Sequence, residues 1–103
     1  MQTSLKKRLE IIIEMPAVPR LEGVLEKAGV KGWTVLPAKS GRGANGSWSR
    51  EGQITSAGRM VMVLTVIDPA VLDTVLERVY ALLERQIGIV MVSDVQVVRA
   101  DRF

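Results

Sequence analysis

The stretch RMVMVLTVIDPAVLDTVLERVYALL, residues 59–83, contains a complete strand-to-helix transition and decides the fold. Residues 59–67 are apolar or β-branched at almost every position, which predicts a strand. Asp68 and Pro69 then predict an N-cap and the first turn of a helix. From there to Leu83 the apolar residues recur with a period of about 3.6 residues, which predicts a helix with one buried face.

Two flanking regions extend this pattern in both directions. KRLEIIIEM, residues 7–15, predicts a strand because Leu9, Ile11 and Ile13 occupy every second position, with Glu10, Ile12 and Glu14 between and after them. RLEGVLEKAG, residues 20–29, predicts a helix that stops at Gly29. WTVLPAK, residues 33–39, and IVMVSDVQVV, residues 89–98, predict two more strands. The order βαββαβ is typical of a ferredoxin-like α+β sandwich, with both helices on one face of a four-stranded antiparallel sheet. We expect residues 1–103 to form one domain.

The strand patterns raise a question about the face of the sheet that carries no helix. Residues 60–67 and 89–98 are apolar at positions that point to both faces, whereas a sheet with one solvated face should alternate polar and apolar residues. Packing of the helix-free face against further copies of the chain explains the pattern, and we favour a homo-oligomer. The alternative is a monomer in which the alternation of polar and apolar residues is irregular at the edges of the sheet.

The composition excludes several classes of function. The chain has no cysteine and no histidine, which removes disulfides, thiolate catalysis, the usual zinc sites and the commonest general base. Glu51 and Asp94 are isolated carboxylates, so we expect no catalytic residue, no metal site and no enzyme. The longest apolar-rich run, residues 60–67, is too short to cross a bilayer, and there is no signal-peptide pattern. A cytoplasmic protein without direct membrane insertion is expected.

The segment PAKSGRGANGSWSREGQITSAGR, residues 37–59, differs in composition from the rest of the chain. Residues 39–59 contain four basic residues against one acidic residue, while the remaining charges balance. This local excess indicates an anion site and not a nucleic-acid surface. Five glycines and four serines predict a mobile loop without secondary structure over residues 39–58. Gly41 and Gly43 flank Arg42 near Lys39, an arrangement that suits a phosphate, with a solvated linker as an equal alternative.

A second glycine and two arginines lie near the last strand. Gly88 precedes this strand, and Arg99 and Arg102 follow it. In an oligomer, the loop base of one subunit can meet the connection before the last strand of another, so we expect a cleft between subunits. Glycine turns would supply backbone donors there, and the arginines would supply phosphate-matching guanidinium groups.

The chain resembles the PII-type signalling proteins in three places: GWTVLPAKSGRG, which corresponds to a strand running into the basic start of the family's T-loop, IGIV of the short B-loop, and VVRADRF of the tail. The resemblance implies a homotrimer with inward-facing sheets and an adenine nucleotide in each intersubunit cleft. Classical members grip a triphosphate with a longer B-loop signature that contains glycine and lysine. Because this chain has only Gly88 there, the resemblance implies ADP or AMP in preference to ATP. The T-loop has Trp48 and lacks the tyrosine that is modified in some members.

The resemblance also implies roles for individual residues. Thr34 would contact the ribose or base, Arg99 and Arg102 would reach the phosphates from the tail, and Trp48 and Arg50 would bind a partner. The remaining nucleotide contacts would come from the loop base and the B-loop: Lys39, Gly41, Arg42, Gly43, Gly88 and Ile89.

Within the family, the chain is most similar to the branch linked with inorganic-carbon uptake, on its glycine–aromatic–Thr–Val strand and its Arg102–Phe103 end. That branch implies bicarbonate as an effector near the phosphates, and a bicarbonate transporter or another carbon-concentration protein as the regulated partner. The ligand would order the T-loop, and the ordered loop would bind or release the partner. A terminal cysteine pair, present in some of the branch, is absent here.

Two other functions share the predicted topology. An RNA-binding module would need aromatic residues on the first and third main strands, where this chain has Ile11, Ile13, Met60 and Met62. A small-molecule sensor of the amino-acid-binding type would not need arginines at the loop base and in the tail.

Overall fold

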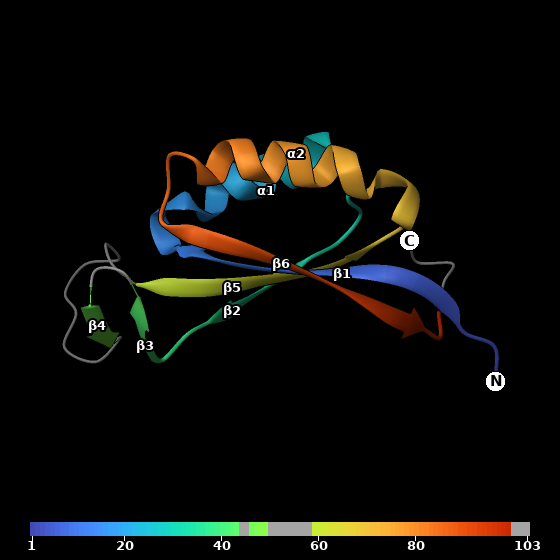
Figure 1. The fold of residues 1–103 in the computed structure, drawn as a ribbon, viewed down its shortest axis with the longest axis horizontal. Helices are drawn as coiled ribbons and strands as arrows, with labels where there is room; N and C mark the ends of the chain where they lie inside the picture. The colour runs from blue at the N-terminus through green and yellow to red at the C-terminus, as the bar shows by residue number, and fades with distance from the viewer. Residues whose placement is uncertain (44–45, 50–58, 100–103) are drawn as a thin grey trace.

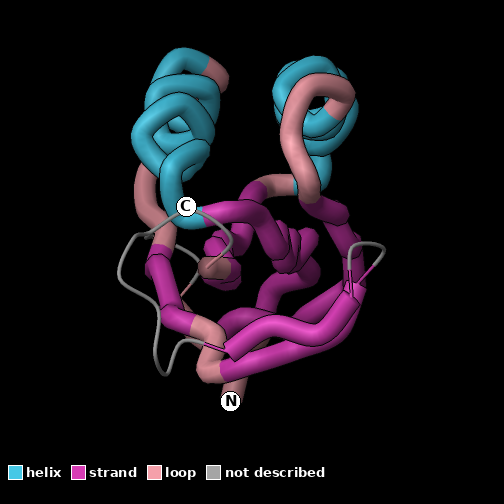
Figure 2. The backbone as a smooth tube through the Cα atoms, turned by 90° about the vertical axis from the view of Figure 1, so that its left-hand side faces the viewer, coloured by secondary structure: helices cyan, strands magenta, loops and turns pink. Residues whose placement is uncertain are grey.

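The computed structural model describes residues 1–43, 46–49 and 59–99. Its main sheet is antiparallel and has the strand order β2-β5-β1-β6, with β1 Ser4–Glu14, β2 Thr34–Pro37, β5 Met60–Ile67 and β6 Gly88–Val97. Helices α1 Val18–Lys27 and α2 Leu72–Leu83 lie side by side on one face (Figures 1 and 2). Short helical turns, η1 Met15–Ala17 and η2 Pro69–Val71, precede them. The ferredoxin-like α+β prediction is confirmed.

Strand β1 pairs along nearly its whole length with two neighbours. Ile13, near its carboxyl end, lies opposite Val61 of β5 and also opposite Gly88 of β6. Both partners therefore start at the end of the sheet where β1 finishes. This places the connection that enters β5 next to the connection that enters β6.

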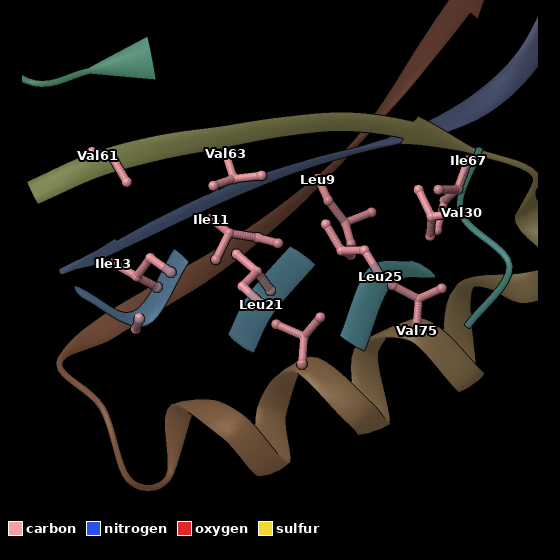
Figure 3. Close-up of a cluster of buried hydrophobic side chains, with 12 residues drawn as sticks. Leu9, Ile11, Ile13, Leu21, Leu25, Val30, Val61, Val63, Ile67 and Val75 are labelled. Atoms are coloured by element: carbon pink, nitrogen blue, oxygen red, sulfur yellow. The ribbon is translucent and has the colours of Figure 1, made fainter. Parts of the chain in front are cut away.

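The core fills the space between the sheet and the two helices (Figure 3). Leu9, Ile11 and Ile13 of β1 are completely buried, and α1 contributes Leu21 and Leu25. The other buried apolar residues are Ala17, Val30, Val61, Val63, Ile67, Val75 and Val79. Alternate β1 positions point to opposite faces, so burial of the odd-numbered residues directs Arg8, Glu10 and Ile12 to the helix-free face.

The helix-free face is largely apolar, as the strand patterns predicted. Cross-strand pairing places Ile12 between Met62 and Ile89 on this face. In the single chain, Ile89 is 55% exposed and Met91 is 41% exposed. A patch of this kind is typical of an interaction surface.

The glycine-rich segment contains secondary structure that the composition did not predict. Strands β3 Ser40–Gly43 and β4 Gly46–Ser49 form a separate antiparallel hairpin, beyond the end of the sheet at which β5 begins (Figure 1). The prediction of a loop without secondary structure is wrong for these residues, while residues 50–58 lie outside the described part of the chain. Gly41 lies opposite Trp48 in the hairpin. Glycine and serine disfavour strands but still offer backbone N–H and C=O groups that can pair.

Asp68 has a different role from the one predicted. It stands at the N-cap position of η2, but its side chain makes no capping hydrogen bond and instead pairs with the ammonium group of Lys6. Pro69 does begin the helical turn, as expected. The stop at Gly29 is confirmed, since this residue has a φ of 85°, a conformation that only glycine adopts without strain.

Thr65 joins β5 to the connection that leads into β2. Its side chain is buried, and its hydroxyl donates a hydrogen bond of 2.6 Å to the carbonyl oxygen of Gly32. We predict that Thr65→Val lowers the free energy of unfolding by about 1–2 kcal/mol, because the carbonyl loses its donor. Chemical denaturation followed by circular dichroism measures the change. The matched control is Thr74→Val on the exposed side of α2, and an equal effect in both variants would contradict the assignment.

Candidate functional site

Two backbone hydrogen bonds fix both ends of the segment that joins β2 to β5. The amide of Ala38 donates to the carbonyl oxygen of Met60 at 3.2 Å, and the amide of Met15 donates to the carbonyl oxygen of Arg59 at 2.8 Å. Each bond ties one end of the segment to the same end of the main sheet, where β1 and β2 finish and β5 begins. Both ends of the segment, and with them the start of the hairpin, are therefore held in place relative to the main sheet.

A pocket of about 460 Å³ lies between the hairpin and the start of β6. Five of the nine predicted nucleotide-binding residues line it: Gly41, Arg42, Gly43, Gly88 and Ile89. The two sets are far apart in sequence and meet here because β5 and β6 both begin at the carboxyl end of β1. The size is within the usual range for small-molecule sites.

The walls of the pocket combine apolar and polar groups. Ile12, Met60, Ile87 and Ile89 supply the apolar part, and Arg42 is the only charged side chain among the lining residues that the structure describes. Ser40 adds a hydroxyl group. Such a lining suits a ligand with an apolar body and an anionic end.

Sequence reasoning missed part of this lining: Ile12, Ala38, Ser40, Met60 and Ile87. One signal was visible for Ile12, an apolar residue between Glu10 and Glu14 on a strand face that is otherwise charged. The others depend on how the strands pair and where the hairpin starts, which the sequence pattern does not specify.

Packing alone already requires a glycine at position 88. A Cβ atom at this residue would lie 2.6 Å from the carbonyl oxygen of Ile12 and 2.7 Å from the Cγ2 atom of Ile13. Both contacts are shorter than side chains tolerate, and the first is with backbone. Gly88 therefore lets β6 approach β1 closely at the wall of the pocket.

The other predicted nucleotide-binding residues lie elsewhere. Thr34 lines a second hollow, of about 420 Å³, together with Trp33, Leu64, Val66 and three neighbours. Lys39 is exposed between β2 and β3 and does not line the first pocket. Arg99 is exposed beyond the end of β6. Arg102 and Arg50 lie outside the described residues, as does the side chain of Trp48.

The positions of these residues show that the prediction of which subunit supplies each part of the cleft was wrong. The loop base and the connection before β6 were expected from different subunits, but they meet within one chain. Arg99 follows Gly88 by eleven residues, a span of roughly 35 Å along an extended strand, so it lies at the opposite end of β6. One chain therefore holds the two halves of the predicted site at opposite ends of its sheet.

Two further properties concern the described part of the chain. Its acidic side chains form no group of three that could hold a metal ion. None of its helices is both long enough and apolar enough to cross a membrane.

The structure thus combines a ferredoxin-like sandwich with a glycine-rich segment that is held at both ends and lies beside the start of the last strand. The family model for nitrogen regulatory protein P-II matches residues 6–102, and the chain belongs to this family. Its members are signalling regulators, which favours regulation over the RNA-binding and amino-acid-sensing alternatives. No curated protein sequence gives a significant match.

Solved structures of PII-like proteins share the whole fold. CPII, a nitrogen regulatory PII-like protein from Thiomonas intermedia K12 bound to ADP, AMP and bicarbonate, is 28% identical, with a TM-score of 0.90 over 99% of this chain and 96% of that chain. A second CPII structure, with ADP and bicarbonate, is 30% identical, with a TM-score of 0.85 over 99% and 97%. A PII-like signalling chain from Thermus thermophilus is 25% identical, with a TM-score of 0.83 over 100% and 99%.

We predict that Gly88→Ala lowers the free energy of unfolding by about 1–3 kcal/mol, because the added methyl group overlaps the backbone of β1. Thermal or urea unfolding measures the effect. Gly23→Ala in α1 is the matched control: a Cβ there meets nothing within 4 Å, and the change should raise stability by about 0.5–1 kcal/mol. A neutral Gly88→Ala variant would show that the close approach is not required.

Proposed function

We propose that the chain is a nucleotide-sensing PII-type regulator that binds ADP or AMP, together with bicarbonate, in clefts between the subunits of a cytoplasmic homotrimer. The observation that carries the proposal is the pocket in which Gly41, Arg42 and Gly43 face Gly88 and Ile89. CPII, which shares 28% identity and the whole fold, has been solved with ADP, AMP and bicarbonate. The charged and apolar parts of this pocket suit a ligand that has a phosphate and an apolar body.

The phosphates belong at the hairpin end of the pocket. Arg42 supplies a guanidinium group there, and the flanking Gly41 and Gly43 have no side chains that would keep a phosphate away from the backbone. Lys39 is close in sequence and adds positive charge at the same end of the sheet. The apolar wall of Ile12, Ile87 and Ile89 excludes water from one side of the ligand, which strengthens these charge contacts.

A neighbouring subunit supplies the rest of the proposed site. The hollow beside Thr34 is lined mainly by apolar groups of Trp33, Leu64 and Val66, which suit a base and a ribose. Arg99 and Arg102 would reach the phosphates from the tail of that neighbour. Head-to-tail contacts that close into a ring repeat such a composite site at every interface.

The helix-free face supports this assembly. Ile89 and Met91 are exposed in the single chain, and Leu36 of β2 is 44% exposed on the same face. Packing this face against two further copies removes an apolar surface from water, with a gain of roughly 25 cal/mol for each Å² buried. The assembly that completes the ligand site is thus the one that covers the apolar face.

For regulation, we propose that the ligands fix the conformation of residues 39–58, and that this segment then binds or releases a partner through Trp48 and Arg50. Bicarbonate in CPII supports a partner in inorganic-carbon uptake, such as a bicarbonate transporter. A coupling free energy of about 1–3 kcal/mol between ligand and partner is sufficient for such a switch. Co-purification of the two proteins with and without ADP and bicarbonate tests this part.

Arg42→Ala should weaken ADP and AMP binding by roughly 10- to 100-fold, the loss of one charge-assisted contact. Calorimetric titration with each nucleotide, with and without bicarbonate, measures the change. Arg78→Ala removes the same charge from the exposed side of α2 and serves as the control. If the wild-type protein binds neither nucleotide, the proposed function fails; if Arg42→Ala binds normally, the phosphates lie elsewhere.

A composite site also predicts complementation between two defective variants. Arg42→Ala lacks the hairpin contribution, and the tail variant Arg99→Ala/Arg102→Ala lacks the contribution of the neighbour. Trimers refolded from an equal mixture should regain high-affinity binding at about a quarter of their sites, because random assortment pairs an intact hairpin with an intact tail that often. Calorimetry gives the number of restored sites. If the mixture binds nucleotide no better than either variant alone, the whole site lies in one chain.

A further inference from the structure

An ion pair lies on the helix-free face, near the middle of the sheet. Arg8 and Glu10 are both on β1, and the Nε atom of Arg8 is 3.3 Å from the Oε1 atom of Glu10. Their side chains are 42% and 25% exposed in the single chain. The ligand site and the hydrophobic core use neither residue.

The surroundings of the pair are mostly apolar. Cross-strand pairing places Glu10 between Leu64 of β5 and Met91 of β6, and Arg8 between Val66 and Ser93. The nearest other basic residue on this face, Lys6, pairs with Asp68. One positive and one negative group thus lie together within the surface that the proposed trimer covers.

The pair leaves hydrogen-bonding capacity unused. Among the described residues, the Nε atom of Arg8 has no hydrogen-bond partner although it is shielded from solvent: Glu10 is close enough for an ion pair but is not aligned to accept the bond. A guanidinium group offers five N–H donors and a carboxylate can accept two parallel bonds. Because Nε is shielded, a carboxylate that approaches Arg8 from outside the chain would meet the N–H groups on the terminal nitrogens of the guanidinium group.

Stability of the assembly does not explain these charges. Burying an ion pair costs desolvation energy, and replacing it with apolar residues of similar volume is often neutral or stabilising. Buried polar groups at an interface are instead best known for selecting one pairing among several similar ones. The apolar remainder of the face could bind many apolar surfaces, so the charges are the part of it that can discriminate.

We infer that Arg8 and Glu10 form a self-recognition lock, in which Arg8 of one copy meets Glu10 of the next, so that the chain assembles with copies of itself and excludes related chains without this pair. The inference rests on the proposed trimer. A second copy is the occupant because the face carries both members of a complementary charge pair, and because the ligand site needs residues from the opposite end of another sheet. A related chain with apolar residues at these positions would bury the pair against an apolar surface, with no group in that chain to complete its hydrogen bonds.

The charge-swap variant Arg8→Glu/Glu10→Arg tests the lock. It should assemble with itself, because each contact between like copies again joins a positive and a negative group. Mixed with the wild type, it brings like charges together at every mixed contact. After co-refolding with mass-tagged wild-type protein, native mass spectrometry should find mixed trimers reduced by more than about tenfold relative to random assortment.

The apolar variant Arg8→Met/Glu10→Leu provides a second arm. It should stay folded and assemble with itself. It should be depleted from mixed trimers because the wild-type ion pair would then be desolvated against an apolar surface without further hydrogen bonds. Random mixing of either variant with the wild type overturns the inference, as does a folded charge-swap variant that remains monomeric. Two differently tagged wild-type samples are the control. If they form no trimer, the proposed function fails; if they form trimers that mix freely with both variants, only the lock fails.

Discussion

The antiparallel pairing of β1 with both β5 and β6 is the constraint on which the rest of the structure depends. Because both partners start where β1 ends, the segment that leads into β5 and the turn that leads into β6 lie side by side, and the pocket forms between them. The same pairing requires Gly88, since any side chain there would overlap the backbone of β1. A residue that suits phosphate binding is thus also dictated by strand packing.

The sheet has two apolar faces that serve different purposes. The helices cover Leu9, Ile11 and Ile13, and this layer stabilises the single chain. The opposite face carries Ile89 and Met91, which in one chain remain open to solvent. The length of β6 separates Arg99 from the hairpin, so a ligand that contacts both must lie between two chains. In the proposed regulator, assembly and ligand binding therefore depend on the same surface.

In the proposed lock, Arg8 and Glu10 supply the specificity of assembly and the apolar residues supply its stability. The apolar residues around them supply the free energy of association, which depends little on the identity of the neighbour. A charge pair adds little net stability but makes a mismatched neighbour costly. In the proposed lock, this difference in cost would decide which related chains can combine.

The sequence by itself determined the order of the two main helices and the four strands of the main sheet, the helix face of β1 and the stop at Gly29, because these depend on local periodicity and backbone preferences. It also pointed to Gly41, Arg42, Gly43, Gly88 and Ile89 as binding residues, which the structure brings together. Only the tertiary structure showed that these residues meet within one chain, that Ile12 and Met60 complete their pocket, and that Asp68 pairs with Lys6 instead of capping η2. The reason is that strand register and side-chain partners are set by contacts between distant segments, and local patterns carry no information about which segments those are.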